Sequence, residues 1–176
     1  MEELLDILDE NGNPTGESKP RSVVHATGLW HRTVHIYFYR KTDYGVELLV
    51  HHRSTTKDLN PNKWDTRFGG HLKAGETLEI ALKNELKEEV GIQVNPGNLT
   101  EGPINRTDKL PNSEFTNVYF YRFDGDINFL KFNDGEVQAV KWMKAEDVLN
   151  SITNHPQDWT SRPSGFAKIK DLLYKL

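Results

Sequence analysis

The sequence predicts an α/β fold of the α+β kind, in which helices pack on a mixed β-sheet. Three observations predict it. Segments rich in β-branched and aromatic residues are interspersed with segments of helical periodicity. Short turn sequences join neighbouring strands, as in hairpins. No repeat or linker divides the 176 residues, so a single domain over residues 1–176 is expected.

The N-terminal third is predicted to consist of strands. Leu4–Leu8 reads as a strand, and residues 11–14 form a turn, since Asn-Gly tolerates a positive φ and proline fixes the exit. Residues 1–30 are therefore expected to form a hairpin extension. Thr33–Arg40 and Val46–His51 follow as the two strands of a second hairpin.

The clearest element is a helix over Glu76–Val90. Thr77 suits the N-cap, and Gly91 suits the position after the last turn. Apolar residues recur every fourth position, at Leu78, Leu82 and Leu86. This spacing predicts a helix with one face buried on the sheet.

The remaining segments alternate between strands and helices. Loops are expected over His52–Asn62 and across most of residues 95–113, with a short, partly extended segment over Trp64–Lys73. The expected strands are Ile92–Val94, a segment around Ile104–Thr107, Phe115–Phe123 and Val137–Met143. The expected helices are Ala145–Ile152 and Gly165–Leu176.

The composition excludes several classes of site. The chain has no cysteine, so thiolate zinc sites and cysteine nucleophiles are excluded. A net charge of −4 argues against a broad nucleic-acid surface, and none is expected. No stretch approaches the roughly 18 apolar residues of a membrane span, and the acidic start does not resemble a secretory signal. A cytoplasmic protein, monomeric or homodimeric, is expected.

Three glutamates lie on one face of the expected helix. Glu85, Glu88 and Glu89 are spaced i, i+3, i+4, which places them within an arc of about 100°. Like charges at this spacing repel one another. A divalent cation would offset that repulsion, since carboxylate oxygens suit Mg²⁺. The alternative is a solvated acidic face.

The surrounding residues favour the metal site. Residues 70–92 read GHLKAGETLEIALKNELKEEVGI, which resembles the Nudix box. Eight of the nine specified positions match, at Gly70, Glu76, Glu85, Leu86, Glu88, Glu89, Gly91 and Ile92. The resemblance implies the Nudix fold, an α/β/α sandwich around a mixed sheet.

The resemblance also implies an activity, the Mg²⁺-dependent hydrolysis of a nucleoside diphosphate linked to another group, or of a related organic diphosphate, with Mn²⁺ as a substitute ion. Glu85 and Glu89 would ligate the metal, with Glu88 in the metal shell and the carbonyl of Gly70 as a further ligand. One of these glutamates, or Glu136 at the start of a strand, would activate the attacking water. For Glu136 the alternative is an ordinary turn charge.

One position departs from the pattern. Asn84 stands where the family has an arginine that pairs with the first glutamate, here Glu76. Asn84 can hydrogen-bond Glu76 but carries no charge, and Lys73 or Lys83 are candidates to supply it. The departure keeps open a weakly active or non-catalytic ligand-binding protein of this fold.

Outside the box, the motifs at residues 29–35, 51–57 and 64–65 resemble a narrower group over residues 4–145, the isopentenyl diphosphate isomerase-like branch of Nudix proteins. Their metal-binding histidines match His25, His31 and His71, although plain packing of these rings is the alternative. The isomerases also need a cysteine for proton transfer, and Phe68-Gly69 occupies that region here. A hydrolase of the same branch is therefore expected, and an isomerase-like enzyme stays an alternative.

Basic residues are expected to bind a small-molecule diphosphate. Arg53 and Lys57 match family positions that contact diphosphate oxygens, and Arg67 would extend the patch. Trp64 is a candidate to line the substrate pocket, with core packing as its alternative. His71, Glu76 and Asn84 are expected to support the site.

Overall fold

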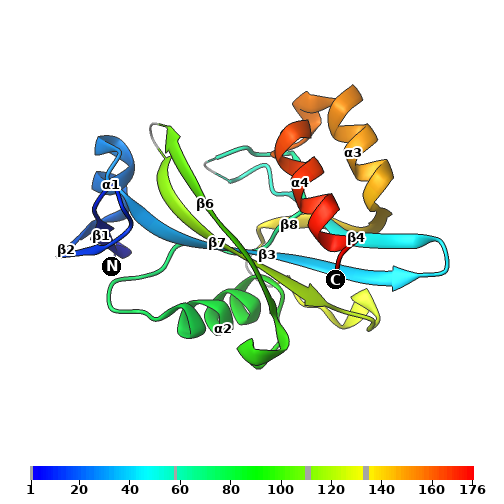
Figure 1. Cartoon of the computed structure of the whole chain (residues 1–176), viewed down its shortest axis with the longest axis horizontal. Helices are drawn as coiled ribbons and strands as arrows, with labels where there is room; N and C mark the ends of the chain where they lie inside the picture. The colour runs from blue at the N-terminus through cyan, green and yellow to red at the C-terminus, as the bar shows by residue number, and fades with distance from the viewer. Residues whose placement is uncertain (1, 58, 110–111, 133–134) are drawn as a thin grey trace.

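The computed structural model describes residues 2–57, 59–109, 112–132 and 135–176 (Figure 1). Its strands are β1 Leu4–Leu8, β2 Pro14–Pro20, β3 His31–Thr42, β4 Gly45–Arg53, β5 Trp64–Asp65, β6 Thr100–Lys109, β7 Asn112–Arg122 and β8 Val137–Lys144. Its α-helices are α1 Arg21–Thr27, α2 Leu78–Glu89, α3 Ala145–Asn154 and α4 Pro163–Leu173. Three short 3₁₀ helices lie at Pro96–Asn98, Ile127–Phe129 and Pro156–Asp158.

A six-stranded mixed sheet forms the centre of the molecule. Its order is β5-β4-β3-β7-β6, and β8 pairs with β4. The β3–β7 pair is parallel, whereas the other pairs of this sheet are antiparallel. This confirms the mixed sheet that the sequence predicts.

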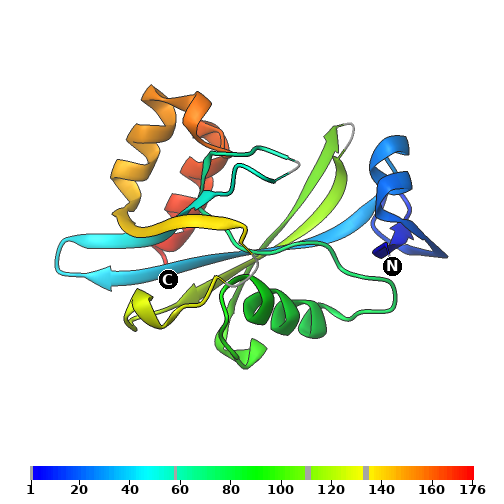
Figure 2. The ribbon, with the colours of Figure 1, turned by 180° about the vertical axis from the view of Figure 1, so that it is seen from behind.

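Helices cover both faces of the sheet. Figures 1 and 2 show α2 on one side and α3 with α4 on the other. One apolar cluster joins α2 to the sheet through Leu82, Leu86 and Phe38. A second joins α3 and α4 to the opposite face through Ile152, Phe166 and Leu48. The α/β/α sandwich is thus confirmed.

The N-terminal extension confirms the expected hairpin and adds a helix. β1 and β2 pair as a separate two-stranded sheet, and α1 follows directly. α1 has only seven residues, of which Val24 alone is buried, so the sequence gives little periodic signal for it. α1 ends at Gly28, which adopts the left-handed conformation.

Around α2 the structure agrees with the expected start of the helix but not with the strand expected after it. The helix begins at Leu78 behind the N-cap Thr77, whose hydroxyl accepts the N–H of Ile80, as expected. The predicted strand at Ile92–Val94 is wrong, since no strand forms there. Ile92 and Val94 instead pack their side chains against the α2 core. Burial of apolar residues, rather than strand pairing, explains that short apolar run.

The first half of β3 holds the segment that precedes α2. The N–H of Val34 donates to the carbonyl of Gly70 at 2.9 Å, and the N–H of Ile36 donates to that of Phe68 at 2.7 Å. The second half of β3 pairs with β4 instead. Residues 68–71, called the glycine segment below, are therefore fixed on the sheet beside α2. Among the described helices, none has the length and apolar character needed to cross a membrane.

Candidate active site

A cavity of about 910 Å³ opens between β3, β4, α2 and the loop after β4. Nine of the residues that the sequence singles out line it: Arg53, Lys57, Arg67, Gly70, His71, Glu85, Glu88, Glu89 and Glu136. The fold thus gathers acidic and basic residues from separate parts of the chain into one space.

The α2 carboxylates meet the glycine segment. The N–H of Gly69 donates to Oε2 of Glu89 at 2.7 Å. The carboxylate of Glu85 lies so close to Gly70 that a Cβ built there would stand 2.7 Å from its Oε1. A side chain at residue 70 would displace Glu85. Glycine therefore leaves room for the close approach of this acidic side chain, which would otherwise have to shift.

The carbonyl of Gly70 has a partner inside the fold, because it accepts the N–H of Val34. A carbonyl oxygen carries two lone pairs, so the role expected for Gly70 as a metal ligand is compatible with this bond. The oxygens of Glu85, Glu88, Glu89 and Gly70 form a donor set of the kind that hard divalent cations prefer. The chemistry of these donors therefore suits Mg²⁺ or Mn²⁺.

Glu85 experiences unfavourable electrostatics without such an ion. Burial and the neighbouring charges of Glu89 and Glu88 raise its pKa to about 8, against a smaller opposing effect of Lys73. Between the unfolded pKa of 4.5 and this value, the folded state binds more protons than the unfolded state. The stability of the metal-free chain should therefore fall as pH rises through this range.

Thermal unfolding in excess chelator measures this effect. We expect the unfolding free energy to fall by up to about 1.4 kcal/mol per pH unit between pH 5 and 8 owing to this one group. Glu85→Gln should flatten the profile, because the residue no longer titrates. A profile that keeps its slope in Glu85→Gln would show that Glu85 is not the group responsible.

Glu76 and Asn84 are hydrogen-bonded to each other beside the loop that precedes α2. Asn84 donates its side-chain N–H to Oε1 of Glu76 at 2.8 Å, and the backbone N–H of Lys73 donates to Oε2 at 3.0 Å. The ammonium of Lys73 lies 3.7 Å from Glu88. Lys83 pairs instead with Glu79, outside the cavity lining. Of the two lysines, Lys73 supplies positive charge beside the carboxylates.

The basic residues form a second region of the cavity. Arg53 donates from Nε to the carbonyl of Asn60 at 3.1 Å and from Nη2 to that of Leu59 at 2.9 Å. Lys57 forms an ion pair with Glu136. Arg53 thus holds the loop after β4, and the Lys57–Glu136 pair joins that loop to the start of β8.

Trp64 lies elsewhere and is absent from the cavity lining. Its ring packs against the cluster beneath α3 and α4, with ring centroids 4.9 Å from His52 and 6.3 Å from Trp159. Trp64 therefore packs against the core, which was the alternative expected for this residue. The strand position turns this side chain to the face opposite the cavity.

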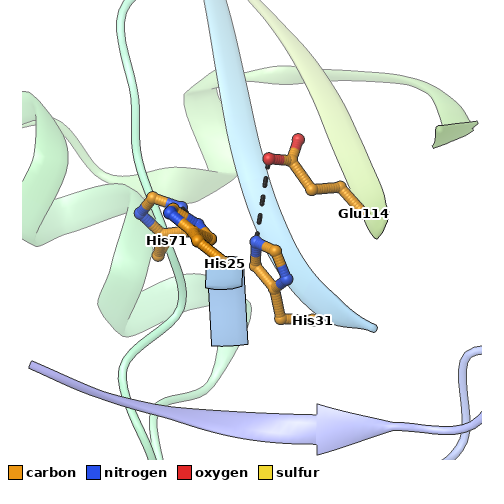
Figure 3. Close-up of side chains that lie close together, drawn as sticks. All are labelled: His25, His31, His71 and Glu114. Carbon is orange, nitrogen blue, oxygen red and sulfur yellow. Dashed lines mark hydrogen bonds and ion pairs between the residues drawn. The ribbon is translucent and has the colours of Figure 1, made fainter. Parts of the chain in front are cut away.

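Three histidines and a glutamate form a second cluster that can hold a metal ion (Figure 3). His25, His31, His71 and Glu114 each offer one ligand atom, and these atoms lie within 4.8 Å of one another. Nε2 of His25 lies 3.2 Å from Nε2 of His71, and Nε2 of His31 lies 3.7 Å from Glu114. In Figure 3 the imidazole rings and the carboxylate converge from α1, β3, the glycine segment and β7.

The environment of this cluster favours neutral imidazoles, the form that binds metals. Burial, together with the charges of Arg21, His31 and His25, lowers the pKa of His71 to about 3. Nε2 of His31 is buried and has no hydrogen-bond partner among the described residues. Imidazole and carboxylate donors together suit zinc, manganese or iron.

The sequence does not single out Glu114 or Asp65, which also line the cavity. Glu114 reaches His31 only because β7 runs parallel to β3, with His31 opposite Glu114. That register joins residues far apart in the chain. No local pattern of the sequence reports it.

Comparison with known proteins finds similar sequences and a similar fold. A family model described as the NUDIX domain matches residues 29–164. Nudix hydrolase 3 of Arabidopsis thaliana is 34% identical over 161 residues, covering 86% of this chain, although the chain spans only 20% of that relative's length. Isopentenyl-diphosphate Delta-isomerase 2 of Photorhabdus laumondii is 29% identical over 170 residues, covering 91% of this chain and 88% of the isomerase.

A solved structure shows the same fold. The crystal structure of DR0079 from Deinococcus radiodurans superposes with a TM-score of 0.71 at 24% identity, covering 98% of each chain. The family match includes the glycine segment, α2 and all six strands of the central sheet. The chain therefore belongs to the NUDIX domain family.

Proposed function

We propose that this chain hydrolyses a diphosphate linkage in a nucleoside diphosphate joined to another group, or in a related organic diphosphate, with Mg²⁺ as its ion. The observation that carries the proposal is the shared cavity. The α2 carboxylates line it together with Arg53, Lys57 and Arg67. Anionic oxygen ligands for a cation and cationic side chains for phosphates are the two halves of such a site.

In this proposal Glu85 and Glu89 ligate the ion, Glu88 lies in its shell, and Gly70 contributes its carbonyl. The bound ion supplies charge neutralisation and Lewis-acid polarisation at the phosphates. Gly69 orients Glu89 through its N–H, and Asn84 with Glu76 braces the loop before α2. The arginines and Lys57 bind the non-bridging oxygens of the diphosphate.

The attacking water gives its proton to one of the carboxylates that line the cavity, Glu85, Glu88, Glu89 or Glu136. Glu136 contacts Lys57 in an ion pair, which stabilises its charged form. That contact favours a role for Glu136 in holding Lys57. The α2 glutamates are the other proton acceptors in this proposal.

We also propose that residues 1–176 act as one domain. The 1–30 extension supports this, because it carries His25 on α1 into the cluster with His71 and His31. The family model begins only at residue 29. In this proposal the extension completes one wall of the site.

The histidine cluster favours a second candidate, an isomerase-like activity on isopentenyl diphosphate. The similarity to the Photorhabdus isomerase agrees with it. Residues 68 and 69, which stand where the isomerases have their cysteine, argue against an isomerase-like activity. Phe68 is buried in the core, and Gly69 has a φ of +134°. A Cβ at residue 69 would stand 2.1 Å from the carbonyl oxygen of Val34.

A substrate panel tests the proposal. The full chain is incubated with nucleoside diphosphate derivatives and isopentenyl diphosphate in Mg²⁺ and in chelator, and the released phosphate or nucleotide is measured. We expect turnover only with the divalent ion. Binding without turnover under Mg²⁺ or Mn²⁺ would instead support a non-catalytic ligand-binding protein. Deuterium uptake by isopentenyl diphosphate in heavy water would support the isomerase-like candidate.

A further inference from the structure

A buried acidic residue, Asp65, lies among the cationic residues of the cavity. It is 3% exposed and lines the cavity with Arg53 and Arg67. Its Oδ2 lies 3.7 Å from Nη1 of Arg53, and its Oδ1 lies 3.5 Å from Nε of Arg67. One carboxylate therefore contacts two guanidinium groups that come from different segments of the chain.

The short strand β5 fixes the position of this carboxylate. Trp64 and Asp65 are its two residues, and successive side chains of a strand point to opposite faces. The packing of Trp64 on the core therefore turns Asp65 towards the cavity. Oδ1 of Asp65 also accepts the backbone N–H groups of Thr66 at 2.8 Å and Arg67 at 3.3 Å.

The charges around Asp65 keep it ionised. Burial alone would raise its pKa, but the charge of Arg67, together with that of Arg53, holds the pKa below its usual value. Burial lowers the pKa of the neighbouring His51 to about 4, so this imidazole is neutral near pH 7. Two arginines and one carboxylate leave a net positive charge at this part of the cavity.

By itself, the carboxylate of Asp65 would repel a phosphate group. Its position in a diphosphate site therefore needs a physical explanation. The separations of 3.5 and 3.7 Å are those of ion pairs rather than short hydrogen bonds. Asp65 thus attracts both guanidinium groups and relieves the repulsion between them, while Arg53 is also held by the carbonyls of Leu59 and Asn60. Two pre-oriented guanidinium groups suit the closely spaced non-bridging oxygens of a diphosphate.

We propose that Asp65 is a positioning residue that holds Arg53 and Arg67 in the orientation that binds the diphosphate group. The inference rests on the diphosphate substrate proposed above. Asp65 does not touch the substrate in this account. It acts through the two arginines.

Calorimetric titration of the full chain with inorganic pyrophosphate in excess chelator tests this role without turnover. Asp65→Asn should bind pyrophosphate about tenfold more weakly, because the guanidinium groups lose their shared partner. A simple charge effect predicts the opposite sign, since removal of a negative charge would tighten the binding of an anion. With substrate and Mg²⁺, KM should rise about tenfold while kcat stays within about twofold.

Three variants accompany the measurement. Glu47→Gln is the matched control, because Glu47 pairs with Arg40 at 2.7 Å away from the cavity lining, and its affinity should equal that of the unaltered chain. In an Arg67→Gln background, Asp65→Asn should lose less affinity than in the unaltered chain, since coupled residues are not additive. Asp65→Glu keeps the charge but displaces it by one methylene. This variant should bind pyrophosphate at least about threefold more weakly than the unaltered chain.

The outcomes separate this inference from the proposed function. Equal or tighter pyrophosphate binding by Asp65→Asn, or no binding by the unaltered chain, overturns the inference. If Asp65→Asn does not fold, as judged by circular dichroism, unchanged binding by Asp65→Glu overturns it instead. Weakened binding without turnover of any substrate on the panel would leave the inference standing and reject the proposed function.

Discussion

Glu89→Gln is expected to lower kcat by a factor of about 10² to 10³ with little change in the fold. Glutamine keeps the shape of the side chain and can still accept the N–H of Gly69. It loses the negative charge that the proposed ion requires. Steady-state kinetics in Mg²⁺, with circular dichroism as the check on folding, measures the effect.

Glu79→Gln is the matched control on the same helix. Glu79 is exposed, pairs with Lys83 at 2.8 Å and does not line the cavity. An exposed pair of this kind contributes only a few tenths of a kcal/mol, so kcat should stay within about twofold. Similar losses in both variants would mean that Glu89 has no special part in turnover.

Gly69→Ala is expected to destabilise the fold by about 3 kcal/mol or more, the second large effect. Gly69 has a φ of +134°, which L side chains rarely adopt. A Cβ would also stand 2.1 Å from the carbonyl oxygen of Val34 on β3. The backbone would have to move away from β3, which would shift the N–H that holds Glu89.

Urea denaturation of Gly69→Ala and Gly75→Ala separates the effect of the positive φ from that of the clash with β3. Gly75 has a φ of +77° but nothing within 4 Å of an added Cβ, so only backbone strain of about 1 kcal/mol applies. Equal losses in the two variants would contradict the account of a close contact with β3. The same contact means that a cysteine at residue 69 would meet β3 in the same way.

The helical part of the site could be predicted because its signal is local. Glu85, Glu88 and Glu89 share a face through helical spacing alone, and the N-cap Thr77 marks where α2 begins. The glycine segment was recognisable from its place before the helix. Its contact with Glu85 follows from the short connection between the two.

The rest of the site depends on pairing between distant segments. Glu114 meets His31 through the parallel register of β3 and β7, and His25 reaches His71 from a helix that gives little sequence signal. Asp65 faces the cavity because β5 has only two residues and Trp64 packs the other way. Neither strand register nor the direction of one side chain in so short a strand follows from local composition.

Anomalous scattering from crystals of the full chain soaked in Mn²⁺ tests the central claim most directly. The account predicts a manganese peak between Glu85, Glu89 and the carbonyl of Gly70, which disappears in crystals of Glu89→Gln. The account would be contradicted if manganese were found only among His25, His31, His71 and Glu114, and the α2 carboxylates bound no ion.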